Sequence, residues 1–405
     1  MDSIEGGAAQ RRNLALMAIA ELLGMTLWFS ASAVVPVLRD DWHLSPLSTA
    51  WLTMSIQMGF VVGTFLSGIF NLPDLINTRR LFGFSAFLGA ASNTAFALLA
   101  RGLAVGIPLR FLTGLFLAGI YPPGMKIAAT WSRQHRGFAI GLLVGALTVG
   151  SALPHLVTSA TAFPWCQVVL TSSVLAVLGG LIVLFLLQEG PFAAPRARFD
   201  PRYVLRVLTE RSLRLANLGY LGHMWELYAM WTWVPIFLME AMVSRGESTA
   251  LAGALSFGVI AIGGIGCILA GVLADRLGRT AVTTGAMVLS GGSALLAASL
   301  YDAPLLLLAP VLFLWGLTIV ADSAQFSASI TELSPPEYMG TALTLQTAMG
   351  FLLTLFSIQL VPFIVQALGW PVAFILLVLG PAFGVFSVLR LRALPEATLL
   401  AGGRR

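Results

Sequence analysis

Twelve stretches of the chain are long and apolar enough to cross a lipid bilayer, and this feature restricts the fold more than any other. A membrane-spanning helix needs about 20 mostly apolar residues, whereas a membrane-spanning strand needs only about 10. The stretches lie at 13–37, 47–71, 80–100, 103–127, 137–159, 165–188, 214–240, 249–273, 280–300, 304–331, 338–364 and 369–391. We therefore predict an all-α polytopic membrane protein with 12 transmembrane helices.

Composition supports this class and excludes several others. The 405 residues are 58% hydrophobic and only 10% charged, whereas soluble domains have about 25% charged residues. A soluble enzyme, a disordered regulator and a nucleic-acid-binding domain are thereby excluded, and the lipid bilayer is the expected surrounding. Cys166 and Cys267 are the only cysteines, so we expect no disulfide framework, no thiolate metal site and no cofactor.

The placement of Lys and Arg predicts the topology. With a cytoplasmic N-terminus, 19 of the 23 basic residues fall in cytoplasmic segments, and only Arg39, Arg101 and Arg245 fall on the opposite side. We expect a multi-pass protein of a bacterial inner membrane with both termini cytoplasmic. The expected organisation is a tail at 1–12, a six-helix bundle at 13–188, a cytoplasmic linker at 189–213, a second six-helix bundle at 214–392 and a tail at 393–405.

Two loops at equivalent places in these halves resemble each other. The loop after the eighth stretch reads GVLADRLGRT from 271 to 280, and the loop after the second reads NLPDLINTRR from 71 to 80. Their acidic residues, Asp74 and Asp275, are separated by almost half the chain. Parallel repeats of this kind place a substrate site at mid-membrane, between the two halves.

The loop at 271–280 resembles the G-x-x-x-D-R-x-G-R-[RK] signature of the major facilitator superfamily. The run from Arg110 to Gly119 resembles a second motif of that superfamily, in its fourth helix. The resemblance implies two six-helix pseudo-symmetric bundles and a loop that acts as a latch between conformations. The expected gating-loop residues are Asp74, Arg79, Gly271, Asp275, Arg276, Gly278 and Arg279. The alternative is that the arginines only anchor the loop at the cytoplasmic membrane face.

Ionisable residues inside the predicted spans are candidates for function, because each costs at least ~2.5–3.5 kcal/mol at mid-bilayer. A carboxylate taken out of water favours its protonated form, and a nearby arginine favours the ionised form. We therefore expect proton coupling through a set of buried groups, with no metal ion. The set is Glu21, Arg110, Glu226 and Asp322. Two structural alternatives remain open: an ion pair between Arg110 and Glu21, and a hydrogen-bonded pair of His223 with Glu226.

Helical spacing groups polar and aromatic residues into stripes that predict a central cavity. On the seventh span, His223, Glu226, Met230 and Trp233 are expected to share one face. Tyr121-Pro122-Pro123-Gly124 is expected to interrupt the fourth span and allow a gate to bend. The predicted cavity residues are Trp28, Tyr121, His155, His223, Trp233, Gln325 and Thr347.

These observations favour a monomeric secondary transporter of a small-molecule substrate, energised by a proton gradient. Proton symport of a small polar or anionic solute is slightly favoured, because the fifth span lacks the Gly-Pro pair of the drug antiporters in the resembled superfamily. The alternatives are a proton-driven antiporter that exports amphipathic compounds and, more remotely, a membrane receptor without transport. A membrane-embedded enzyme is not expected, since no G-x-S-x-G, H-E-x-x-H or Walker sequence is present.

Overall fold

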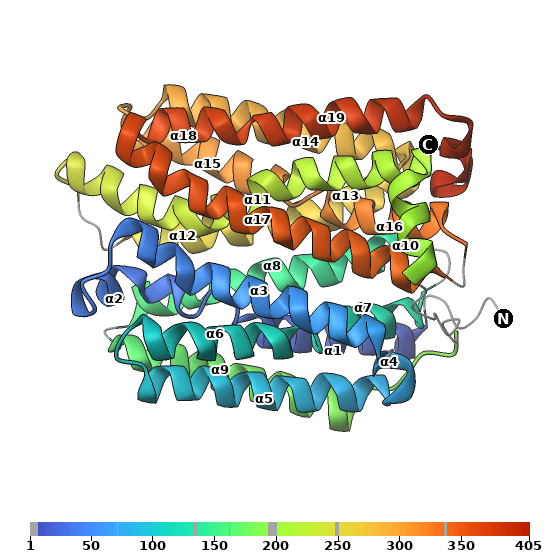
Figure 1. Ribbon diagram of the computed structural model, residues 1–405, viewed down its shortest axis with the longest axis horizontal. Coiled ribbons are helices and arrows are strands. Elements are labelled where there is room, and N and C mark those ends of the chain that lie inside the picture. The colour runs from blue at the N-terminus through green and yellow to red at the C-terminus, as the bar shows by residue number, and fades with distance from the viewer. Residues whose placement is uncertain are drawn as a thin grey trace.

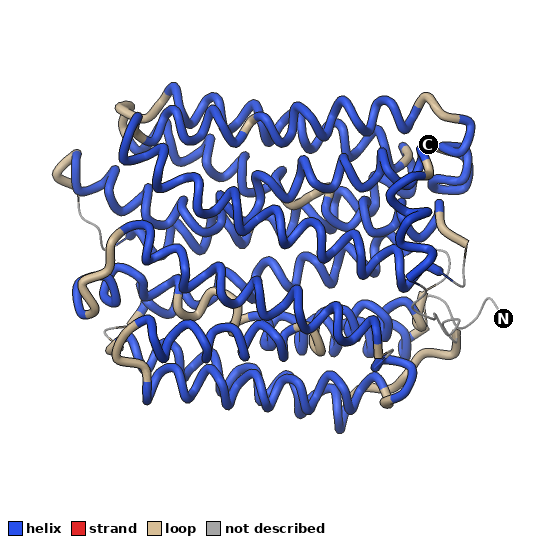
Figure 2. The backbone as a smooth tube through the Cα atoms, viewed as in Figure 1, coloured by secondary structure: helices blue, strands red, loops and turns tan. Residues whose placement is uncertain are grey.

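The computed structural model describes residues 7–70, 72–132, 136–161, 163–192, 201–247, 251–335 and 338–405. Within these ranges the regular structure is helical throughout, without a strand (Figure 2). The helices run along one direction, and the start of α1 and the C-terminus lie at one end of the molecule (Figure 1). We call this end the basic end, and the end with α2 the opposite end.

The first half of the chain forms one bundle, drawn in blue and green in Figure 1. Within it α3 packs on α6, α5 on α9, and α1 on both α8 and α9. Its elements are α1 (Ala8–Met25), η1 (Ser32–Val34), α2 (Val35–Asp41), α3 (Pro46–Ile69), α4 (Leu72–Leu75), α5 (Thr78–Leu99), α6 (Leu103–Leu117), α7 (Tyr121–Ala129), α8 (Arg136–Ala160), α9 (Trp165–Leu181) and a π-helical turn, η2 (Ile182–Leu186).

The second half forms the bundle drawn in yellow-green to red, together with the linker helix α10. Within it α11 packs on α19 and α17, and α14 packs on α15 and α19. Its elements are α10 (Pro201–Thr209), α11 (Arg211–Ser244), α12 (Ala252–Ala261), α13 (Gly263–Leu277), α14 (Arg279–Ser299), α15 (Leu305–Ile319), α16 (Ser323–Leu333), α17 (Met339–Leu368), α18 (Trp370–Leu377), α19 (Leu379–Arg392) and η5 (Pro395–Gly403).

In the described ranges, eleven helices have the length and composition to cross a membrane. They confirm eleven of the twelve predicted spans. The remaining one, 13–37, is not a continuous helix, because α1 ends at Met25 and α2 begins only at Val35. Its α1 portion also carries Glu21, and α1 carries Arg11 and Arg12 just before it, which lowers the apolar character of this helix. The predicted interruption of the fourth span is confirmed, because α6 ends at Leu117 and α7 begins at Tyr121.

Glycines let α3 and α6 touch through their backbones, as the small residues after Arg110 predicted. A Cβ atom on Gly114 would lie 1.8 Å from the carbonyl oxygen of Ile56, and one on Gly59 would lie 1.9 Å from that of Phe111. No side chain fits at these contacts, so this pair of helices is fixed at a short distance.

We expect Gly114→Ala to separate α3 from α6 and to lower stability by about 1–3 kcal/mol, the usual cost of overpacking. Thermal unfolding of the protein in detergent micelles measures this change. Gly285→Ala is the matched control, because a Cβ at this position in α14 meets no atom within 4 Å; it should be neutral or slightly stabilising. Equal unfolding temperatures for the two variants would contradict the packing argument.

The two halves contact each other mainly through α8 against α12 and α13, and through α3 against α17. Glycines again face backbone across this boundary. A Cβ on Gly141 would lie 2.7 Å from the carbonyl oxygen of Cys267, and one on Gly145 would lie 2.8 Å from that of Gly264. The halves are therefore in close contact along α8, so a small separation breaks many contacts at once.

Candidate functional site

A cavity of about 490 Å³ opens between the halves toward the opposite end. At its wall, Arg39 of the first half and Glu240 of the second form an ion pair of 3.9 Å, and the Trp370 indole donates a 2.9 Å hydrogen bond to Glu240. We call this the outer cavity. Its lining residues are Val35, Pro36, Arg39, Asp40, Thr49, Trp233, Ile236, Met239, Glu240, Pro362, Val365, Gln366 and Trp370.

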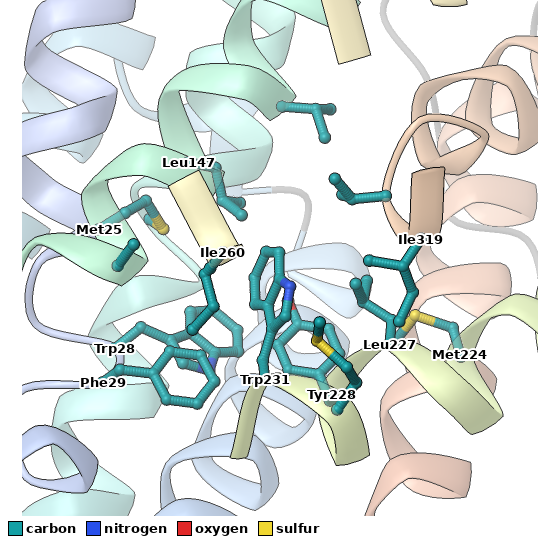
Figure 3. Close-up of a cluster of buried hydrophobic side chains, with 14 of the residues drawn as sticks. Met25, Trp28, Phe29, Leu147, Met224, Leu227, Tyr228, Trp231, Ile260 and Ile319 are labelled. Atoms are coloured by element: carbon teal, nitrogen blue, oxygen red, sulfur yellow. The ribbon is translucent and has the colours of Figure 1, made fainter. Parts of the chain in front are cut away.

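Six aromatic side chains fill the space between the halves toward the middle of the molecule. Trp28, Phe29 and Phe60 come from the first half, whereas Tyr228, Trp231 and Phe351 come from the second. Their ring centroids lie 4.7 Å apart for Phe60 and Phe351, 5.4 Å for Trp28 and Phe351, and 5.7 Å for Trp28 and Tyr228. We call these six residues the central aromatic layer; Figure 3 shows four of them, Trp28 and Phe29 facing Tyr228 and Trp231.

A second, much smaller cavity of about 30 Å³ lies against the layer on the side of the basic end. Its lining combines aromatic, aliphatic and hydroxyl side chains and includes no acidic, basic or histidine residue. We call it the inner cavity. It is lined by Tyr121, Met125, Val144, Leu147, Tyr220, Met224, Leu227, Tyr228, Trp231, Val320, Ser323, Ser327, Thr347 and Phe351.

Glu21 is completely buried in α1, and neither oxygen of its carboxyl group has a hydrogen-bond partner among the described residues. The group lies against the start of α7, because a Cβ on Gly124 would come within 2.5 Å of the Glu21 Oε2 atom. A buried carboxyl group without a partner is costly. Among the described acidic residues, Glu21 is therefore the one whose burial is least explained by a structural role.

Arg110 is also completely buried, but its partners are not carboxylates. Its guanidinium donates to the carbonyl oxygens of Leu27, at 3.1 Å, and Trp28, where the chain leaves α1. It also donates at 3.1 Å to the hydroxyl of Ser30 and to the side-chain oxygen of Asn93. The structural alternative of an Arg110–Glu21 ion pair is wrong, because the break after α1 presents carbonyl oxygens that the guanidinium satisfies instead.

The second half contains two further buried acids with different partners. Glu226 accepts hydrogen bonds of 2.7 Å from Ser290 and 2.8 Å from the Trp315 indole. Asp322 lies 2.9 Å from His223 Nδ1, at the interruption between α15 and α16. The alternative of a hydrogen-bonded His223–Glu226 pair is therefore wrong: both residues turn into the second bundle, each toward a partner on another helix.

At the basic end, Arg279 connects the predicted gating loop to the second bundle. Its guanidinium forms ion pairs of 3.1 Å with Asp275 and 2.9 Å with Glu332, and it donates a 2.9 Å hydrogen bond to Gln325. Arg276, in contrast, is exposed. Glu332 also accepts a hydrogen bond from the backbone of Ala401 in η5, so the end of the chain is held against the same network.

The loop also touches the first half. The Asp275 carboxylate lies where a side chain on Gly137 would be, and a Cβ on Gly271 would come within 2.6 Å of the Gly137 carbonyl oxygen. Gly278 has a φ of +98°, a conformation that favours glycine. Asp275 and Gly271 therefore form the part of the signature loop that contacts the other half.

We expect Gly271→Ala to push α13 away from α8 and to open the basic end. Because overpacking costs about 1–3 kcal/mol, the open population should rise by about 5–150-fold. Cys267 reports this opening, since it is completely buried one turn away in α13. Its alkylation rate by N-ethylmaleimide, followed by mass spectrometry, should rise accordingly. Half-buried Cys166 is the internal reference. An unchanged alkylation rate of Cys267 would contradict the expectation that a side chain at position 271 pushes α13 away from α8.

The first-half copy of the loop is only partly described. Arg79 donates to the carbonyl oxygens of Val183, at 3.1 Å, and Leu184, so it holds the π-helical turn after α9. The side chain of Asp74 lies outside the described residues. A latch at Arg79 and Asp74 therefore stays a prediction.

The predicted cavity residues separate into three places. Tyr121 and Thr347 line the inner cavity, Trp233 lines the outer cavity, and Trp28 belongs to the central aromatic layer. The remaining three, His155, His223 and Gln325, are buried but line neither cavity.

The inner cavity is lined by a different face of α11 from the predicted stripe, of which Trp233 lines the outer cavity. The inner-cavity residues of this helix are Tyr220, Met224, Leu227, Tyr228 and Trp231, which lie beside the predicted stripe and not on it. The aromatic and methionine side chains on this face are the sequence signal that could have identified it. The prediction instead follows the ionisable residues, on the premise that they face a water-filled cavity. No cluster of three or more histidine, cysteine or acidic residues suited to a metal ion occurs among the described residues.

Comparison with known proteins identifies the family. The family model described as Major Facilitator Superfamily matches residues 17–358. The chain is 24% identical over 295 residues to a niacin transporter of Acinetobacter baylyi, a match that covers 62% of this chain and 64% of that protein. It is 25% identical over 371 residues to an inner membrane metabolite transport protein of Escherichia coli, covering 83% and 80%.

The fold is similar to that of a solved proton:xylose symporter, with a TM-score of 0.72, 15% identity, and coverage of 94% of this chain and 95% of that one. The architecture is thus all-helical and multi-pass. The chain belongs to the major facilitator superfamily, a family of membrane transporters and not of enzymes.

Proposed function

We propose that the protein is a proton-coupled secondary transporter of a small organic solute, working by alternating access between its two halves. The observation that carries this proposal is the position of Glu21: a buried carboxyl group without a hydrogen-bond partner in the described part of the chain, on the helix that ends beside the central aromatic layer. Such a group can exchange a proton when the surrounding helices move. Glu226 and Asp322 are further candidate proton or solute sites.

The outer cavity and the closed basic end together support alternating access. In the proposed cycle, the outer cavity admits solute while the contacts around Asp275, Arg279 and Gly271 hold the other side closed. Separation of α8 from α13 then opens the basic end. We assign the basic end to the cytoplasm of a bacterial cell, because the chain's arginines concentrate there.

Symport is favoured over antiport by the similar proteins. One is named a niacin transporter, a second a D-galactonate transporter, which is 24% identical over 264 residues, and the solved structure is a proton:xylose symporter. Antiport of amphipathic compounds is the second candidate, favoured by the absence of charged residues from the inner cavity.

Proteoliposomes with a pH-sensitive dye in the lumen test the proposal. Niacin, D-galactonate and xylose are added outside one at a time, in parallel with lipophilic cations. Symport predicts solute-dependent acidification of the lumen, whereas antiport predicts alkalinisation. Solute entry that leaves the lumen pH unchanged, and that a protonophore does not affect, would contradict proton coupling.

A further inference from the structure

The central aromatic layer is built across the boundary between the halves, so its rings separate when the halves move apart. Trp28 of the first half contacts Phe351 and Tyr228 of the second, and Phe29 contacts Trp231 at 6.0 Å. Rings that part in this way expose flat apolar faces on both sides of one gap. A flat solute can then occupy the gap and be enclosed when the halves come together again.

The layer also contains hydrogen-bond donors without acceptors. The indole nitrogens of Trp28 and Trp231 have no hydrogen-bond partner among the described residues, although both side chains are 1% exposed. Gln57 lies one helical turn from Phe60; its side-chain oxygen accepts from Thr354 of the other half, while its nitrogen is also without a partner. A buried donor left unpaired costs about 1–3 kcal/mol, so these groups indicate a missing acceptor.

Other tryptophans of the chain show that this is a local property. Five indoles elsewhere donate to a defined oxygen: Trp131 to Gln188, Trp225 to Leu376, Trp233 to Ile358, Trp315 to Glu226 and Trp370 to Glu240. The two buried indoles without a partner among the described residues both lie in the central aromatic layer. The unpaired donors therefore gather where the halves meet.

The charge of a bound solute is also restricted. The inner cavity beside the layer has no charged lining residue. Arg110, which lies near Trp28 in space, already donates to the Leu27 and Trp28 carbonyls, Ser30 and Asn93. An anion enclosed here would lose its hydration without gaining a free cation, which is unfavourable in a low-dielectric site.

From these observations we propose that the layer is the solute site and that it selects a planar aromatic or heteroaromatic molecule, uncharged when bound, that presents an oxygen or nitrogen acceptor. The ring stacks between Trp28 on one side and Tyr228 and Phe351 on the other. The acceptor atom of the solute accepts a hydrogen bond from the indole N–H of Trp28 or from the amide N–H of Gln57. This assignment rests on the proposed transport function but is tested by binding, apart from transport.

Equilibrium dialysis of the full chain in detergent against benzamide, cyclohexanecarboxamide and benzoate tests this assignment. The first two share the amide acceptor and differ in ring planarity, whereas benzoate keeps the ring and adds a charge. We expect benzamide to bind at least about five-fold more tightly than either, as stacking and desolvation require. Trp28→Leu should lose this preference, and Trp28→Phe, which keeps a ring but lacks the N–H, should retain part of it.

Trp42→Leu is the matched control, because the ring partners of Trp42, Phe96 and Trp165, both belong to the first half. It should leave the preference for benzamide unchanged. Variants are compared at equal folded fraction, and Phe351→Leu, which removes a ring on the other side of the gap, replaces Trp28→Leu if the latter unfolds. Equal binding of the two amides, stronger binding of benzoate, no binding of any ring compound, or a preference that survives both Trp28→Leu and Phe351→Leu overturns the assignment.

The proteoliposome assay separates this assignment from the transport proposal. Selective benzamide binding without solute-dependent change of lumen pH means that the site is correct and that proton-coupled transport is wrong. A pH change driven by a solute without a ring, together with no selective benzamide binding, means the reverse.

Discussion

Arg110→Met should destabilise the protein by about 3 kcal/mol and abolish transport. The Arg110 guanidinium donates to the Trp28 carbonyl oxygen, and it also donates to Leu27, Ser30 and Asn93 in the interior. Methionine fills a similar volume but donates nothing, so buried acceptors are left unpaired at about 1–3 kcal/mol each. Thermal unfolding in detergent measures the loss.

A double variant distinguishes this positioning role from charge pairing. If Arg110 served mainly to neutralise Glu21, adding Glu21→Gln to Arg110→Met would restore stability. Because Arg110 instead holds the chain between α1 and η1, the double variant should unfold as early as the single one. Arg110→Lys should fail as well, since one ammonium group cannot reach several acceptors in the geometry of a guanidinium. If the double variant regained the wild-type unfolding temperature, Arg110 would act mainly as the ion-pair partner of Glu21, and the positioning role would be wrong.

The spans were predictable because hydropathy and length are local properties of the sequence. The breaks were predictable only where the sequence itself prevents a helix. Tyr121-Pro122-Pro123-Gly124 predicts the interruption at the start of α7. The break between α1 and η1, in contrast, contains neither proline nor glycine. That break exists because Arg110, far away in sequence, satisfies the carbonyl oxygens that the helix releases. A contact of this kind leaves no periodic signal.

The candidate site was predictable in its residue types but not in its orientation. The acidic residues that the sequence singled out, Glu21, Glu226 and Asp322, are all buried. Periodicity gives neighbours on one helix, but it does not say which neighbouring helix they face. His223 and Glu226 share a face as expected, yet that face turns toward Asp322, Ser290 and Trp315. The neighbouring aromatic face of α11, with Tyr228 and Trp231, lies at the boundary between the halves instead.

Glu21→Gln should remove proton coupling while leaving the fold intact. Glutamine has the shape of the protonated acid and cannot exchange a proton. No hydrogen bond to the Glu21 carboxyl group is lost, because none is formed by the described residues. We expect an unchanged or slightly higher unfolding temperature. Solute-driven change of lumen pH should disappear, and affinity for the transported solute should no longer differ between pH 6 and pH 8.

The size of this effect follows from the coupling free energy between proton and solute. Coupling of 1–3 kcal/mol between two sites changes affinity by about 5–150-fold, so the pH dependence of wild-type binding should lie in that range and fall to none in Glu21→Gln. Glu396→Gln, at an exposed position in η5, is the control for the acid-to-amide change. Because solute exchange across the membrane needs the moving halves but no proton, exchange should persist in Glu21→Gln. A variant that keeps its pH dependence would move proton coupling to Glu226 or Asp322.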